Sequence, residues 1–109
     1  MKRGAIVVVA TRGAYTGKPR PALVVQSDLF NPTHASVTLC PITTDCVDAP
    51  LFRQSLPPGT RTGLRSVSQV MIDKVVSVPR QAITEEIGEC NSGEMEAVDT
   101  GLRRWLQIE

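Results

Sequence analysis

Six short runs of apolar, β-branched residues, each bounded by Gly, Pro, Asn or Asp, are the feature of this 109-residue chain that most constrains its fold. They lie at Ala5–Ala10, Ala22–Gln26, Val37–Pro41, Leu51–Leu56, Val67–Ile72 and Val75–Val78. Short strands at close spacing, separated by turn residues, are typical of a small β-barrel. The sequence therefore predicts six strands that curl into a barrel like that of SH3 domains.

Near the end of the chain the hydrophobic pattern changes from strand spacing to helix spacing. Asn91 and Glu94 have the spacing of a capping box, in which each side chain bonds the backbone of the other. Gly101 lies inside the pattern and would permit close packing. Apolar residues share one helical face and are expected to be core: Met95, Val98, Leu102, Trp105 and Leu106. We predict an α+β fold in which a small barrel carries a C-terminal α-helix, as a single domain over residues 1–109.

Arg20 lies between two prolines, immediately before one of the predicted strands. Pro19 and Pro21 each fix their own φ and favour an extended conformation in the preceding residue. The arginine is therefore expected on stiff backbone at the mouth of a strand. A guanidinium held in this way suits a phosphate or a carboxylate, while a solvated loop arginine is the alternative.

Several segments, taken in order along the chain, form a specific set. A first strand that opens at Gly4 and a Gly- and basic-rich loop are followed by Arg20-Pro21-Ala22-Leu23-Val24-Val25, Asp28-Leu29-Phe30-Asn31, Pro41-Ile42-Thr43, Gly63-Leu64 and Ile72-Asp73-Lys74. This set covers nearly the whole chain and resembles the MazF/PemK/Kid family of toxins, small ribonucleases of bacterial toxin–antitoxin pairs. The resemblance implies the fold that the MazF, Kid and CcdB toxins share.

The same resemblance implies a function. It implies an endoribonuclease that cuts single-stranded mRNA at specific sequences and so inhibits growth. Cleavage would use no metal or other cofactor and would leave a 2′,3′-cyclic phosphate and a 5′-hydroxyl. The expected partners are a second copy of the chain, as a homodimer in the cytoplasm, and a cognate antitoxin whose acidic, partly disordered segment covers the basic groove.

The resemblance also assigns catalytic candidates. In this family the arginine before Pro-Ala-Leu-Val and the hydroxyl residue of the Pro-Ile-Thr segment are the catalytic pair, and the matching residues here are Arg20 and Thr43. Arg20 would stabilise charge on the phosphate, and Thr43 would orient the reacting phosphate. Thr44 is either a contact to the RNA backbone or a solvated turn residue.

Asp73 matches a family position that is acidic in several members, and the resemblance implies that it acts as a base or contacts the RNA. A strand-end cap or an ion pair with Lys74 or a nearby arginine is the alternative. The Kid toxin also uses an arginine two positions earlier, where this chain has Met71, and a histidine in the first loop, which this chain lacks. His34 lies in a turn that the resemblance does not link to the active site, so we do not expect it to be catalytic.

Two long loops, Thr11–Pro19 and Pro57–Gly63, are candidates for binding RNA. Phosphate contacts are expected from basic residues in or beside them, and base stacking from the one ring in the first loop; a solvated surface is the alternative for each. These candidates are Arg12, Lys18, Arg61 and Arg65 for phosphates and Tyr15 for a base.

The net charge of +1 conceals an asymmetry along the chain. Residues 1–80 hold ten Lys or Arg and four acids, whereas residues 81–109 hold two bases and seven acids. A basic body with an acidic end suits an anionic ligand on one face.

The cysteines and the apolar runs exclude other classes of protein. Cys40, Cys46 and Cys90 lack Cys-x-x-Cys spacing, so with one histidine they predict neither a zinc site nor a disulfide framework but thiols in a reducing cytoplasm. The longest apolar run, Ala5–Ala10, is too short to cross a bilayer, so no membrane association is expected.

Two other functions remain open. The gyrase-inhibiting toxins share this fold and act by binding a protein through the C-terminal helix, where this chain has Trp105. A catalytically inactive RNA-binding member is the other. The presence of both Arg20 and Thr43 favours the nuclease, because a pure binder has no need of that pair.

Overall fold

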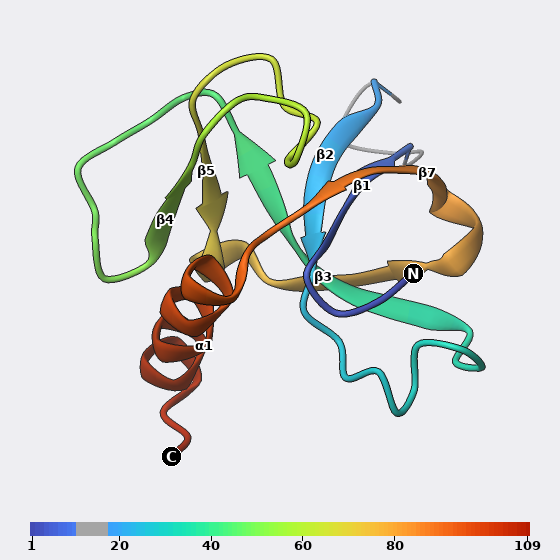
Figure 1. Cartoon of the computed structure of the whole chain (residues 1–109). Helices are drawn as coiled ribbons and strands as arrows, with labels where there is room; N and C mark the ends of the chain where they lie inside the picture. The colour runs from blue at the N-terminus through green and yellow to red at the C-terminus, as the bar shows by residue number, and fades with distance from the viewer. Residues whose placement is uncertain (11–17) are drawn as a thin grey trace.

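The computed structural model describes residues 1–10 and 18–109, which form an antiparallel sheet of seven strands and one C-terminal helix (Figure 1). The strands are β1 (Ala5–Val9), β2 (Arg20–Val24), β3 (Ser36–Thr43), β4 (Arg53–Leu56), β5 (Ser68–Met71), β6 (Val76–Pro79) and β7 (Ile83–Glu89). Two 3-10 turns, η1 (Ile72–Lys74) and η2 (Arg80–Ala82), flank β6, and the helix is α1 (Ser92–Leu106).

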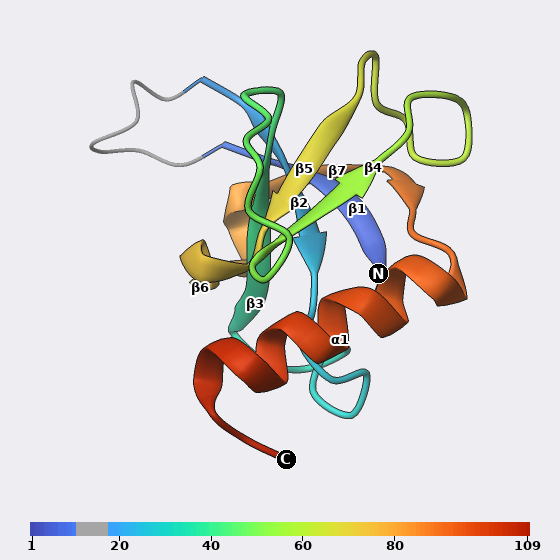
Figure 2. The same ribbon diagram turned by 90° about the vertical axis from the view of Figure 1, so that its left-hand side faces the viewer.

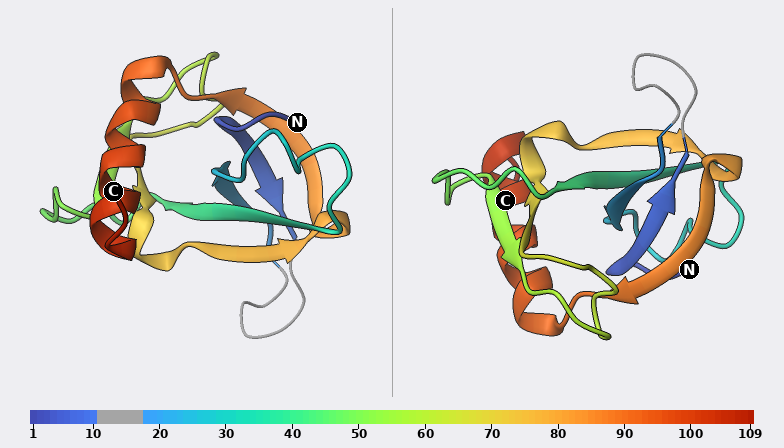
Figure 3. Two further views of the ribbon diagram at one scale, coloured as in Figure 1. Left: turned by 90° about the horizontal axis from the view of Figure 1, so that it is seen from below. Right: turned by 90° about the horizontal axis from the view of Figure 1, so that it is seen from above.

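The strand order is β4-β5-β3-β2-β1-β7, with β6 paired to β3. Strand β6 pairs with the first half of β3, and strand β5 pairs with the last two residues of β3. The sheet curves strongly, as Figure 3 shows, but its outer strands β4 and β7 do not pair with each other within residues 1–10 and 18–109. The predicted α+β class is confirmed, and the barrel is an open one.

Each of the six predicted runs overlaps a strand, although β2, β3 and β6 extend beyond the predicted bounds, and the structure adds a seventh strand. Strand β7 has the sequence Ile-Thr-Glu-Glu-Ile-Gly-Glu and is mostly exposed. Its two isoleucines, Ile83 and Ile87, are four residues apart, so the sequence carries no alternating pattern to mark a strand. It forms because β1 offers it a buried partner edge, with two register shifts along the ladder.

The central strands are buried on both faces. In β2, Leu23 packs into one apolar cluster, together with Cys40 and Ile42, while Ala22 and Val24 pack into a second cluster. Burial on both faces explains why these strands are almost continuously apolar in sequence. Buried central strands therefore give a rigid backbone to the residues at their ends.

Helix α1 closes one face of the sheet and begins at the predicted capping box (Figure 2). The side chain of Asn91 accepts the backbone N–H of Glu94, and Glu94 Oε1 accepts that of Asn91, both at 2.8 Å. Val98 is fully buried, and Gly101 packs against Ile72. Within the described residues no helix is long and apolar enough to span a membrane.

The last turn of α1 departs from the expected core face. Trp105 and Leu106 are each about half exposed, at 50% and 51%. The rings of Trp105 and Phe52 form an edge-to-face pair, with ring centroids 6.0 Å apart. Helical spacing gives the direction of an apolar face but not the extent of the partner surface, and the prediction that these two residues are core was wrong.

Candidate active site

One end of the sheet gathers the start of β2, the end of β3 and the connection between β4 and β5. All three lie at the upper end of the molecule in both Figure 1 and Figure 2. Arg20 is the first residue of β2 and Thr43 the last residue of β3. This end of the sheet therefore carries both predicted catalytic residues.

The strand register, continued two residues beyond the last pair of the ladder, lines Arg20 up with Thr43. The ladder between β2 and β3 pairs Val24 with Leu39, Leu23 with Cys40 and Ala22 with Pro41. Continued by two residues, the same register brings Arg20 across from Thr43. Residues directly opposite in an antiparallel pair project on the same face, with Cβ atoms about 5 Å apart in a regular ladder.

Arg20 is exposed, and its neighbours hold its backbone. On its other side it pairs with Val9 of β1, whose side chain is buried. The guanidinium makes no hydrogen bond or ion pair with any other described residue. A stiff backbone with an uncommitted side chain suits binding of an anion from outside the chain.

Thr43 is held by the turn that follows it. Its Oγ1 accepts the backbone N–H of Asp45 at 3.0 Å, and its backbone lies opposite Gln69 of β5. A hydroxyl group has one donor hydrogen and two acceptor lone pairs. The bond from Asp45 uses one lone pair, so the hydroxyl hydrogen of Thr43 can be donated to a ligand.

The chain after Thr43 leaves the sheet and is fastened by two side chains. Gln69 Oε1 accepts the N–H of Val47 at 3.1 Å, and Gln69 Nε2 donates to the carbonyl of Val47 at 2.9 Å. Arg53 Nη1 donates to Gln69 Oε1 at 3.0 Å and to the carbonyl of Asp45 at 3.2 Å. A shallow depression of about 300 Å³ lies here, lined by Val47, Asp48, Ala49, Pro50, Arg53, Gln54, Ser55 and Gln69.

Gln69 and Arg53 were not among the sequence candidates. The only signal was a polar residue inside an apolar run, since Gln69 interrupts Val67–Ile72 and its side chain is largely buried there. A buried amide must find hydrogen-bond partners. The sequence does not say which ones.

Asp73 lies away from Thr43. It is in η1, which occupies the gap along β3 between the ladders with β5 and β6, beside Cys40 and Pro41. Burial raises the pKa of Cys40 to about 12, and the charge of Asp73 adds to that shift. Asp73 Oδ1 is buried without a hydrogen-bond partner among the described residues, and neither the expected cap nor an ion pair with Lys74 is present there.

The candidate RNA contacts divide into three groups. Lys18 is exposed and lies two positions before Arg20, and Arg65 is exposed in the β4–β5 connection. Thr44 is exposed next to Thr43. Arg61 is committed elsewhere, because it donates to both carboxylate oxygens of Glu94 at 2.7 and 3.0 Å. Arg12 and Tyr15 lie outside the described residues.

His34 and the three cysteines lie apart from the pair Arg20 and Thr43 or carry no bond to it within residues 1–10 and 18–109. His34 Nδ1 accepts the N–H of Ser36, at the opposite end of β3 from Thr43. Cys40 and Cys90 are buried and Cys46 is exposed, all three as free thiols. No group of three or more metal-binding side chains occurs in the part of the chain that the structure describes.

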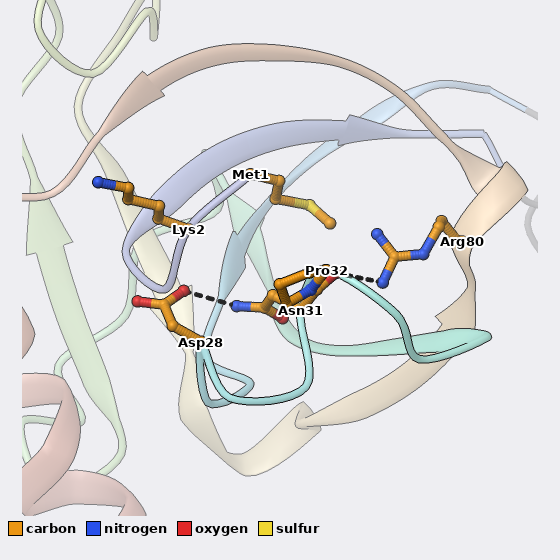
Figure 4. Close-up of a pocket in the computed structure, with 6 residues that line it drawn as sticks. All are labelled: Met1, Lys2, Asp28, Asn31, Pro32 and Arg80. Atoms are coloured by element: carbon orange, nitrogen blue, oxygen red, sulfur yellow. Dashed lines mark hydrogen bonds between the residues drawn. The ribbon is translucent and has the colours of Figure 1, made fainter.

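A second depression lies at the other end of the sheet (Figure 4). It has a volume of about 590 Å³ and is lined by Met1, Lys2, Asp28, Asn31, Pro32 and Arg80. Three of its polar side chains bond within the chain: Asp28 accepts from Arg3 and Asn31, and Arg80 donates to the backbone of Asn31 and His34. It is separate from Arg20 and Thr43.

Comparison with known proteins shows the family of this chain. The family model described as PemK-like, MazF-like toxin of type II toxin–antitoxin system matches residues 2–106. A protein of Mycolicibacterium smegmatis named probable endoribonuclease MazF is 49% identical over 108 residues, covering 99% of this chain and 98% of that one. This chain belongs to the PemK/MazF toxin family.

Further PemK/MazF proteins match over most of their length. Endoribonuclease MazF6 of Mycobacterium tuberculosis is 34% identical over 97 residues, covering 88% of this chain and 85% of that one. Among solved structures, an endoribonuclease in complex with its cognate antitoxin, from a mycobacterial species, superposes with a TM-score of 0.83 at 20% identity. That match covers 100% of this chain and 97% of the other, and it supports the fold of the family.

Proposed function

We propose that this chain is a sequence-specific endoribonuclease that cleaves single-stranded RNA and acts as the toxin of a toxin–antitoxin pair. The observation that carries the proposal is the β2–β3 register, which lines Arg20 up with Thr43 at one end of the sheet when it is continued two residues beyond Ala22 and Pro41. The relatives named as endoribonucleases add support, since the M. smegmatis protein matches over nearly the whole of both chains.

The proposed reaction is an attack by the 2′-oxygen of a ribose on the adjacent phosphorus. The bond between phosphorus and the 5′-oxygen breaks, which leaves a 2′,3′-cyclic phosphate and a 5′-hydroxyl. The 2′-hydroxyl loses one proton and the leaving 5′-oxygen gains one. The reaction consumes no water, so positioning and charge stabilisation are the main requirements.

Arg20 and Thr43 would meet these requirements together. The guanidinium of Arg20 can donate two parallel hydrogen bonds to the oxygens of the phosphate as negative charge builds on it. The hydroxyl hydrogen of Thr43, which the bond from Asp45 does not use, would be donated to one of the same two non-bridging oxygens and would fix the phosphate for in-line attack.

The RNA would run along the exposed end of the sheet. Lys18, Thr44 and Arg65 would contact its backbone, and Arg12 and Tyr15 stay predicted contacts of the loop before β2. Phosphate contacts supply affinity without sequence choice, so sequence choice would come from bases read by the loops. We also propose a single toxin domain, a homodimer in the cytoplasm and an antitoxin segment with acidic residues that covers this basic end.

The test is cleavage of a long RNA by the purified protein in EDTA, with the cut sites mapped by primer extension. Discrete sites are expected that weaken by about 10²- to 10³-fold in Arg20→Ala, the usual effect of removing one preorganised donor. Arg103→Ala is the matched control, because Arg103 is an exposed arginine on α1. A wild-type protein that binds RNA without cutting it, or that blocks supercoiling by gyrase instead, would contradict the proposal.

A further inference from the structure

The segment that follows Thr43 is not part of the sheet, yet it fixes the position of the Thr43 hydroxyl. The bond from the Asp45 N–H to Thr43 Oγ1 closes a local turn over residues 43–45. The turn has local backbone bonds, such as that from the Cys46 N–H to the carbonyl of Thr44 at 3.1 Å. Local bonds alone do not fix where such a segment lies relative to the sheet.

Gln69 supplies the missing attachment. Its side-chain amide bonds both the N–H and the carbonyl of Val47, as a neighbouring strand would with its backbone. The side chain of Gln69 therefore binds Val47, four residues beyond Thr43, whose backbone is paired with Gln69 in the β3–β5 ladder. A single residue thus holds both ends of the turn, Thr43 through the backbone and Val47 through the side chain.

Arg53 fixes the Gln69 amide in turn. Its Nη1 donates to Gln69 Oε1 and to the carbonyl of Asp45, the residue whose N–H reaches Thr43. Gln69 is only 9% exposed, so its amide has few alternative partners in water. Oε1 accepts two hydrogen bonds and Nε2 donates one, which leaves the amide little freedom to rotate.

We propose that Gln69 is a positioning residue for Thr43: it anchors residues 44–47 so that the Asp45 N–H holds the Thr43 hydroxyl in one orientation. This inference rests on the proposed function of Thr43. Gln69 itself does not touch the reacting phosphate. Its loss leaves Thr43 in place but lets its hydroxyl rotate, because the segment that carries Asp45 then keeps, among the described residues, only the bond from Arg53 to the Asp45 carbonyl and the long contact of 3.8 Å from Cys46 Sγ to the Val67 carbonyl.

The test is a double-mutant cycle between Gln69→Leu and Thr43→Val, measured by single-turnover cleavage of a short RNA with the protein in excess. Gln69→Leu keeps the size of the side chain and removes its hydrogen bonds. A misplaced catalytic group costs about ten- to a hundredfold in rate, and we expect this loss in the single-turnover rate constant at saturating protein, with little change in the protein concentration that gives half of that rate. In the Thr43→Val background the same substitution should cost less than about threefold, because the group it positions is gone.

Gln54→Leu in β4 is the matched control. Gln54 lies in the strand next to Gln69, and its amide bonds only the carbonyl of Ser55 among the described residues. The Gln54→Leu variant should leave the single-turnover rate constant at saturating protein nearly unchanged. Thermal unfolding of each variant shows that it is folded at the assay temperature.

A second measurement does not depend on cleavage. Three-bond NMR couplings to Cγ2 report the χ1 rotamer of Thr43, which should be single in the wild type and in Gln54→Leu but averaged in Gln69→Leu. A single rotamer in Gln69→Leu, or additive losses in the cycle, would overturn the proposal. A wild-type protein that cuts no RNA would instead sink the proposed function, and the rotamer would still decide the role of Gln69.

Discussion

Arg61 and Glu94 form a two-pronged ion pair that joins the β4–β5 connection to the first turn of α1. Nη1 of Arg61 lies 2.7 Å from Oε1 of Glu94, and Nη2 lies 3.0 Å from Oε2. The same Oε1 also accepts the backbone N–H of Asn91 in the capping box. One carboxylate therefore caps the helix and ties it to a loop more than thirty residues earlier in the chain.

We expect Glu94→Ala to lower the melting temperature by about 4–8 °C, the effect of losing about 1 kcal/mol of helix capping in a domain of this size. Glu94→Gln should cost less, because glutamine can still accept from Asn91. Arg61→Ala should lower stability only slightly and leave RNA cleavage nearly unchanged. Arg61→Ala with normal stability and strongly weakened RNA binding would contradict this assignment.

The contribution of this ion pair depends on pH with a definite sign. The hydrogen bond from Arg61 holds the pKa of Glu94 below its ordinary value of 4.5 in the folded protein. The stabilisation is therefore complete above that ordinary value and is lost as the pH falls through the lowered pKa. The difference in melting temperature between the wild type and Glu94→Gln should shrink on acidification below about pH 4.5. A difference that grows on acidification would show the opposite sign.

Much of the fold follows from local patterns in the sequence, and the exceptions have physical causes. The buried strands and the capping box were predictable because β-branched runs and an Asn-x-x-Glu spacing act locally. Strand β7 was missed because its pairing with β1, and not its own composition, stabilises it. Trp105 was misplaced because its exposure depends on where the sheet ends beneath α1.

The candidate site shows the same division between local and long-range information. Arg20 and Thr43 were singled out through the family resemblance that their flanking residues carry, and their catalytic roles stay predictions. The roles of Arg53 and Gln69 depend on hydrogen-bond partners that lie up to 22 residues away in sequence. Arg61 was predicted to bind phosphate because no residue near it in sequence indicates its ion pair with Glu94.

Gly101 and Ile72 offer a test of the packing between α1 and the sheet. A Cβ on Gly101 would lie 2.5 Å from Cδ1 of Ile72, far inside a normal contact. Overpacking a core costs about 1–3 kcal/mol, against about 1 kcal/mol gained from the better helix propensity of alanine. We expect Gly101→Ala to destabilise the protein in chemical denaturation.

The same pair supplies its own control. Ile72→Val removes Cδ1, so Gly101→Ala should be neutral or stabilising in that background. The coupling between the two substitutions should reach about 1 kcal/mol, as for residues in direct contact. Additive effects would show that the clash is relieved in some other way.

Asp73 tests whether an acidic residue takes part in cleavage. The structure sets it beside Cys40 and Pro41, away from the Thr43 end of β3, with one buried oxygen unpaired among the described residues. We expect Asp73→Asn to change the single-turnover rate by less than about threefold, because it removes no group in contact with the phosphate. A loss comparable to that of Thr43→Val would instead make Asp73 part of the catalytic machinery.

Arg20→Lys separates the charge of the arginine from its shape. Lysine keeps the positive charge at the start of β2 but cannot donate two parallel hydrogen bonds to one phosphate. We therefore expect KM to stay near that of the wild type, since charge supports binding of the RNA backbone. The value of kcat should remain at least about tenfold low, because the paired donors act on the charge that builds up in the transition state. Steady-state cleavage over a range of RNA concentrations, with the RNA in excess, measures both quantities. A lysine variant with near-normal kcat would mean that only net charge matters at this position, and the geometric role given to the strand register would then be unnecessary.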